Sequence, residues 1–325
     1  MSRHKSTVSL DKEINKLNLP CYETLASLLP LLTLLEKLNP CGQEYEVSNG
    51  SVIISYRLSL NLFNFRRIFP LNVHVQIIGL PVSVCLSGFF GNYIEAEKNI
   101  KQRKGLKILL NSDHPFKGGG KTLSTFVFEN RFEDFDQYLS SLRSPYRRRI
   151  NKALREREKL VIKTLSRYDF NKVHYDLYLS IMGRTENPLE TLPIEFFREY
   201  DAELFEFSDR ETHNVVGFIQ LKAIKNKLYF LFGGFKKEDI PAYDIYYNML
   251  LKIVETGIEK RVEEIEFGQT AEESKLKIGC REKYKYMTAH HSNPLINSFI
   301  SMLLPLFSYR PYPVKHHVFK DKGEK

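Results

Sequence analysis

Hydrophobic residues recur along this chain at two spacings, which predict different elements of secondary structure. Alternation with a period of two, or a short run of β-branched residues, predicts a strand, whereas recurrence at every third or fourth position predicts a helix. The first half accordingly predicts a hairpin that turns at Asn49-Gly50, a dipeptide that favours positive φ angles. The other elements expected there are helices at 22–37, 93–104 and 132–142 and strands at 72–79, 82–87, 105–110 and 122–128.

The second half predicts a regular succession of strands and helices. Three apolar strands in a row, AELFEFSD, VVGFIQLKAI and KLYFLFGGF, precede the strong helical pattern of 245–261. The strand VEEIEFG and the short helix TAEESKLKIG follow. The rest of this half consists of a strand at 161–165, helices at 170–184 and 192–200, and a final strand at 283–292.

The stretch HPFKGGGKTLST (114–125) resembles the end of a phosphate-binding loop, but its surroundings argue against that function. The motif requires a glycine five residues before Gly120, and that position is Pro115. The following residues, TLSTFVF, predict a strand, so no helix N-terminus would face a phosphate. We therefore expect a glycine loop between two strands.

Composition bounds the class of protein. The chain has 325 residues, enough for two domains, with 42% apolar residues, a formal net charge of +9 and a pI near 9.1. This charge suits an anionic partner, whether nucleic acid, a phosphorylated cofactor or a membrane surface. The four cysteines, at 21, 41, 85 and 280, form no CxxC pair, so no metal site is expected. Without a signal peptide or a long apolar run, the sequence predicts a cytoplasmic protein with no transmembrane segment.

A second basic feature is the helix expected after Pro145. It carries seven cations, namely Arg147, Arg148, Arg149, Lys152, Arg155, Arg157 and Lys159. Such a helix is either a solvated face or a surface that contacts phosphates, and the sequence leaves both readings open.

The order of elements in the second half resembles the GNAT acyltransferase superfamily. A narrower resemblance, to Fem-like proteins and the CelD-type acetyltransferases, rests on four segments that occur in the same order: FEDFDQYLSSLRSPYRRRINKA, HYDLYLSIMGR, LYFLFGG before a helix, and IEFGQTAEESKLKIGC. The late lysine and glycine of that family match Lys275 and Gly279, with Ser274 in place of tyrosine. The usual Q/R-x-x-G-x-G/A signature of the superfamily is absent.

The resemblance implies a fold and a domain division. The expected fold is a mixed α/β (α+β) sheet protein with two GNAT-like domains in tandem, the N-terminal one degenerate. The expected boundaries are 1–158 for the first domain, ending with the basic helix, 159–316 for the acyltransferase domain, and 317–325 for a disordered tail.

The resemblance also implies a donor site, in which the pyrophosphate of acyl-coenzyme A lies on the N-terminus of the helix at 245–261. Between the strands before and after that helix, the pantetheine arm would enter a gap. The residues expected to bind the donor are Gly233, Gly234, Phe235, Tyr243, Asp244 and Ile245.

Candidate catalytic residues are Glu266, Lys275 and Tyr247. Glu266, near the end of its strand, could deprotonate an amine, with Tyr243 and Tyr247 as rivals or packing residues. Lys275 could neutralise a phosphate or an oxyanion, or could be a solvated helix lysine. Arg184 and Gln269 are candidates for binding the acceptor, and Arg184 could equally cap its helix.

The expected function is transfer of an acyl group, in the first place acetyl, from acyl-coenzyme A to an amine or hydroxyl of a small molecule or peptide. One alternative is a Fem-like transferase that uses aminoacyl-tRNA and acts on a cell-wall precursor, to which the basic helix is suited. The other is a nucleic-acid-binding protein without enzymatic activity; only Tyr146 offers a stacking surface beside the basic stretch.

Overall fold

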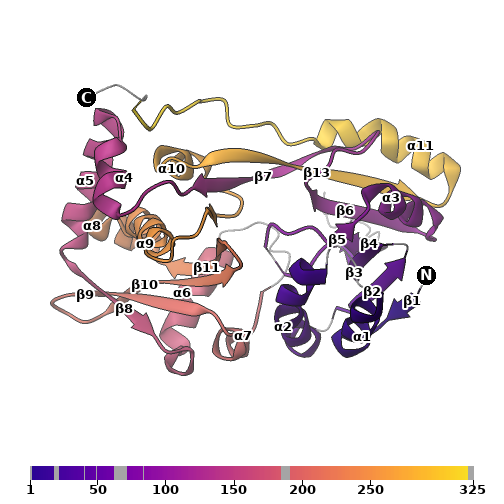
Figure 1. Ribbon diagram of the computed structural model, residues 1–325, viewed down its shortest axis with the longest axis horizontal. Coiled ribbons are helices and arrows are strands. Elements are labelled where there is room, and N and C mark those ends of the chain that lie inside the picture. Colours follow the sequence, from indigo (N-terminus) through magenta and orange to yellow (C-terminus); the bar gives the residue numbers. More distant parts are fainter. Residues whose placement is uncertain are drawn as a thin grey trace. The chain divides into compact units, whose positions relative to one another are not determined.

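The computed structural model (Figure 1) describes residues 2–17, 22–39, 41–48, 50–61, 72–82, 84–183 and 191–320. It is a mixed α/β protein whose chain divides into two compact units. The first unit consists of Met1–Ser124 and Tyr284–Arg310, and the second of Thr125–Lys283 and Pro311–Lys325. Two strands, β7 (Gly120–Glu129) and β13 (Arg281–His291), contribute residues to both.

The first unit is built on a sheet with the order β1-β2-β3-β4-β6-β13, and β5 pairs with β3. Its strands are antiparallel except for β4 and β6, which run parallel. The elements are β1 (Ser2–His4), α1 (Thr7–Leu17), α2 (Tyr22–Leu38), β2 (Glu44–Ser48), β3 (Ser51–Asn61), β4 (Asn72–Ile78), β5 (Phe89–Gly91), α3 (Tyr93–Gln102), β6 (Leu106–Ser112), α11 (Pro294–Leu303) and the 3₁₀ turn η3 (Leu304–Phe307).

The second unit has the strand order β7-β12-β11-β10-β9-β8, in which β11 and β12 form the parallel pair. Its other elements are α4 (Phe135–Ser141), α5 (Ser144–Arg157), β8 (Leu160–Leu165), η1 (Arg167–Asp169), α6 (Lys172–Met182), α7 (Ile194–Glu199), β9 (Glu203–Asp209), β10 (Val215–Ile224), β11 (Lys227–Phe235), η2 (Lys237–Asp239), α8 (Ile240–Tyr243), α9 (Ile245–Glu259), β12 (Glu264–Glu266) and α10 (Glu272–Lys277).

Helices cover both faces of β11 in the second unit. A Cβ added to Gly233 would meet Met249 of α9, whereas one added to Gly234 would meet the backbone of α6. Because successive strand residues point to opposite faces, α9 and α6 lie on opposite sides of the strand. On the α6 side, Phe170 stacks on Phe197 with ring centroids 4.7 Å apart.

The basic helix forms as α5, and part of its charge is used within the protein. Ile150 is fully buried. Arg149 donates to both carboxylate oxygens of Asp244, which precedes α9, and Arg157 donates to both carboxylate oxygens of Glu255 in α9. Three cations at helical spacing remain exposed: Arg148, Lys152 and Arg155. The helix therefore combines a packing face with an exposed basic face.

Three expectations need correction or completion. The units do not divide at 158, because α5 packs on α9 and distant strands complete each sheet. Residues 317–320 are not a disordered tail, since Val318 is buried and accepts a hydrogen bond from the Arg143 backbone; 321–325 lie outside the described residues. No strand forms at 82–87 among the residues described there. A loop at 113–119 that contains Gly118 and Gly119 connects β6 and β7, as predicted, although Gly120, Lys121 and Thr122 already belong to β7.

Candidate functional site

The parallel strands β11 and β12 part soon after they begin. They are paired only where Lys227–Tyr229 lie opposite Glu264–Glu266. β11 then continues along β10 to Phe235, whereas the chain after β12 bonds to β7: Phe267 N donates to the Phe126 carbonyl at 2.9 Å. We call residues 230–235 of β11, together with residues 267–271 after β12, the splay. The separation of these strands was expected from the sequence resemblance.

A β-bulge lies at the start of the splay. Gln220 of β10 is opposite Phe232 and Leu221 is opposite Phe230, so Leu231 is an extra residue on β11. A bulge bends its strand and increases the local twist. β11 is therefore bent directly after its pairing with β12 ends.

The chain that leaves β12 has an unusual backbone, and Lys275 stabilises it. Gly268, Thr270 and Ala271 have φ angles of 70°, 63° and 50°. A left-handed conformation costs a residue other than glycine roughly 1–2 kcal/mol. The Lys275 ammonium, whose residue is 2% exposed, donates to the carbonyls of Gly268 (3.2 Å) and Gln269 (2.6 Å). The reading of Lys275 as a solvated lysine is therefore wrong.

Tyr247, in the first turn of α9, is buried beside the same loop. Burial raises the pKa of its phenol and outweighs the charges of Arg149 and Lys277 and a hydrogen bond with Ser274, which lower that pKa. The Arg149 guanidinium lies 3.5 Å from the centre of the ring. A phenol with a raised pKa stays protonated at neutral pH, so Tyr247 is unsuited to act as a base and is present there as an O–H group.

Cys280 is a buried free thiol close to two candidate residues. Burial raises its pKa, the Lys275 charge lowers it and the Glu266 charge raises it, so both groups lie within electrostatic reach of the sulfur. Because the thiolate is the reactive form, this cysteine is a poor nucleophile at neutral pH. The sequence-predicted residues Glu266, Lys275 and Tyr247 thus lie around the end of β12 and α10.

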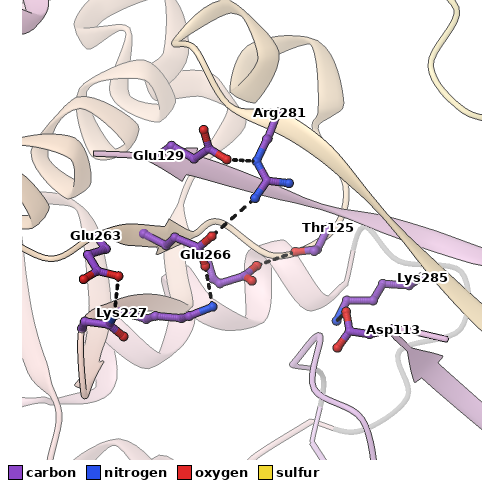
Figure 2. A network of polar contacts seen from close by, with 10 residues as sticks. Asp113, Thr125, Glu129, Lys227, Glu263, Glu266, Arg281 and Lys285 are labelled. Carbon is purple, nitrogen blue, oxygen red and sulfur yellow. Dashed lines mark hydrogen bonds and ion pairs between the residues drawn. The ribbon is translucent and has the colours of Figure 1, made fainter. Parts of the chain in front are cut away.

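The two carboxylates on the same face of β12, Glu264 and Glu266, have different partners; Figure 2 labels Glu266 and Thr125, which a dashed line joins. Glu264 pairs with Lys227 and with Arg281, which also binds Glu129. Although burial opposes it, Lys227 and Arg281 hold the pKa of Glu264 below its usual value. Glu266, which adjoins the splay, accepts a hydrogen bond from the Thr125 hydroxyl at 3.1 Å. Only Glu266 of this pair is therefore placed at the splay with a neutral hydroxyl as partner.

The start of α9 does not form an open anion site. Asp244 precedes the helix in a left-handed conformation (φ 47°), and its carboxylate is held by Arg149, with one N–O distance of 2.9 Å. A helix N-terminus attracts anions through its free N–H groups and its dipole. Here a carboxylate of the chain already lies beside that end, which weakens the expected pyrophosphate site.

The other residues expected to bind the donor are engaged in packing. A Cβ on Gly234 would lie 2.6 Å from the backbone of Leu177 and Tyr178, so its lack of a side chain is required by α6. Phe235 and Ile245 are buried, and Gly233 is paired with β10. The end of β11 and the start of α9 thus offer fewer exposed backbone N–H groups to a donor than the sequence indicates.

The remaining candidates differ in position. The Tyr243 hydroxyl donates to Asp209 at 3.0 Å, which directs this side chain toward the end of β9. Gln269 lies in the splay loop, where its carbonyl accepts from Lys275. Arg184 lies outside the described residues. Sequence reasoning missed Thr125 and the structural role of Arg149, because both act on residues far away in the chain and no local pattern marks them.

Within the described part of the chain, no three His, Cys, Asp or Glu side chains are grouped so that they could hold a metal ion. The residues described at the site are a carboxylate, Glu266, a buried phenol, Tyr247, and a loop held by the Lys275 ammonium.

No protein-family model and no curated protein sequence matches the chain. Solved structures do share its fold. FemX has a TM-score of 0.55 at 12% identity, covering 93% of this chain and 100% of that one. A conserved protein of unknown function from Bacteroides thetaiotaomicron has a TM-score of 0.51 at 9% identity, covering 88% and 98%. At this identity the likeness concerns the fold alone, a mixed α/β fold shared with FemX, which agrees with the fold class expected from the sequence.

Proposed function

We propose that the second unit transfers an acyl group from acyl-coenzyme A to an amine or hydroxyl acceptor, and that the reaction takes place at the splay. The observation that carries this proposal is the early separation of β11 and β12. On the side of β11 away from β10, the pairing with β12 ends at Tyr229, and residues 230–234 pair with no other strand of the described residues. Such an edge offers backbone N–H and C=O groups to the amides of an extended pantetheine arm.

The side chains at the splay suit direct transfer. The acceptor nitrogen would attack the thioester carbonyl and form a C–N bond while the C–S bond breaks. Glu266 would take the proton of the acceptor, and the neutral phenol of Tyr247 would donate one to the departing thiolate. Lys275 would act as a positioning residue, through the loop carbonyls it binds. The raised pKa of Cys280 disfavours an acyl-cysteine intermediate.

A second donor is supported by two observations at the edges of this site. The Asp244 carboxylate beside the N-terminus of α9 disfavours a pyrophosphate there. The exposed cations Arg148, Lys152 and Arg155 on α5 suit a longer polyanion. The corresponding function is Fem-like transfer from the ester of an aminoacyl-tRNA to the amine of a cell-wall precursor, in which a C–N bond forms while the ester C–O bond breaks and the tRNA leaves with its hydroxyl.

Calorimetric titration of the full chain with acetyl-coenzyme A distinguishes the donors. Saturable binding that free coenzyme A competes away is expected for the first donor. Absence of binding, combined with aminoacyl transfer that falls in an Arg148→Gln/Lys152→Gln/Arg155→Gln variant, would replace it with the second. An Arg57→Gln variant, which removes an exposed cation from the first unit, is the matched control.

A further inference from the structure

The outward face of α11 is apolar. Leu295, Phe299 and Met302 are 83%, 59% and 65% exposed, and Leu306 in η3 continues the row at 78%. Their spacing of four, three and four residues places them along one line of a helix. We call these four residues the α11 stripe.

The helix that bears the stripe is well formed and is held by its other side. Asn293 caps it by accepting from the Leu295 and Ile296 backbones, and the Asn297 side chain accepts from the His291 backbone at 2.9 Å. Leu304, directly after the helix, is buried. A surface helix normally turns its apolar face inward and its polar face to water. In α11 (yellow in Figure 1) the most exposed large side chains are apolar, so this face is suited to a partner.

Most of the net positive charge of the chain lies in the unit that carries this helix. The first unit has 17 Lys and Arg residues against 9 Asp and Glu, whereas the second has 31 against 30. Residues 284–310, which include α11, contain no acidic residue. Arg310, three residues after η3, is exposed. Lys121 is joined to this segment by a hydrogen bond from the Tyr309 backbone N to the Lys121 carbonyl (2.8 Å).

We propose that the α11 stripe binds the surface of an anionic lipid bilayer. The helix would lie flat, with the stripe among the upper acyl chains and Arg310 and Lys121 near the headgroups. An apolar helix face and nearby basic residues together give the two signals that stable interfacial binding requires. None of the helices in the described residues is long and apolar enough to cross a bilayer. The proposal is independent of the acyl transfer proposed for the second unit.

Self-association through the stripe is disfavoured by the same charges. Two copies that met stripe to stripe would bring two strongly basic units together, and like charges repel. An anionic bilayer instead attracts the basic unit while it covers the apolar side chains. The charge distribution therefore favours lipid over a second copy of the chain.

Co-sedimentation of the full chain with vesicles tests this proposal. Binding to an equal mixture of phosphatidylcholine and phosphatidylglycerol is expected to exceed binding to phosphatidylcholine alone by about tenfold, and to weaken with salt. A Phe299→Ser/Met302→Ser variant should lose about tenfold in binding, because two apolar anchors are removed. Arg310→Gln should weaken binding to the mixed vesicles only. Val8→Ser, at a helical residue that is 64% exposed in the same unit, is the matched control and should bind like the parent.

Three results would overturn the proposal. The first is a parent protein that stays in the supernatant with both kinds of vesicle. The second is a Phe299→Ser/Met302→Ser variant that folds, as judged by circular dichroism, and sediments like the parent. The third is light scattering that shows a dimer of the parent which this variant abolishes, since the stripe would then join two copies.

Discussion

Replacement of Gly234 by valine is expected to lower the free energy of unfolding by about 3 kcal/mol. Even the first added atom, Cβ, would lie 2.5 Å from the Phe218 ring and 2.6 Å from the backbone of α6. Because backbone atoms cannot turn aside as a side chain does, α6 would have to move away from the sheet. Urea denaturation of the parent and the variant measures this change.

Gly183→Ala is the matched control for Gly234→Val. Gly183 ends α6 with φ near −65°, and an added Cβ would meet nothing closer than 3.3 Å. A change of within about 0.5 kcal/mol is expected there, as at most permissive surface sites. Equal stability of Gly234→Val and the parent would show that α6 does not pack against β11 as described. The sequence alone suggests that Gly234 gives room to a pyrophosphate, whereas in the fold α6 occupies that space.

Replacement of Glu266 by glutamine is expected to lower kcat of acyl transfer by about 10²–10⁴-fold, the usual contribution of a general base. The change removes the proton acceptor but keeps a side chain of similar size that can still accept from Thr125. Stability and donor binding should change little. Release of free coenzyme A, followed with a thiol reagent in the presence of an amine acceptor, measures the rate.

Glu264→Gln is the control for Glu266→Gln, since both carboxylates lie on one face of β12. Glu264 is committed to Lys227 and Arg281 and is not at the splay. Its replacement should therefore affect stability more than kcat. Similar losses of kcat in the two variants would point to the charge of the strand as a whole and would remove Glu266 from the role of base.

Local patterns predict most of the second unit. The alternating and helical stretches from 203 to 279 give β9 to β12, α9 and α10 close to their observed bounds, since apolar periodicity reflects which face of each element is buried. The same kind of pattern is misleading at VSVCLS (82–87). Its β-branched residues favour a strand, but it lies between Pro81 and Gly88, and an isolated bridge joins Gly79 and Ser87 instead.

Long-range pairing could not be predicted in this way. The boundary between the units falls inside β7 and β13, so each sheet is completed by a strand from a distant part of the chain. The candidate site shows the same limit. Glu266 and Lys275 are visible in the sequence, but the Thr125 hydroxyl and the Arg149–Asp244 pair come from segments more than 90 residues away in the chain. Side-chain types alone do not indicate which distant partner they will meet.

Photoaffinity labelling tests the central claim, that the donor's acyl group lies at the splay. An acyl-coenzyme A with a diazirine at the end of its acyl chain would be irradiated with the full protein, and the labelled peptides would be sequenced by mass spectrometry. Labels in residues 228–235 or 264–280, suppressed by excess free coenzyme A, are the predicted result. Labels confined to the first unit, or labelling that free coenzyme A does not suppress, would contradict the assignment.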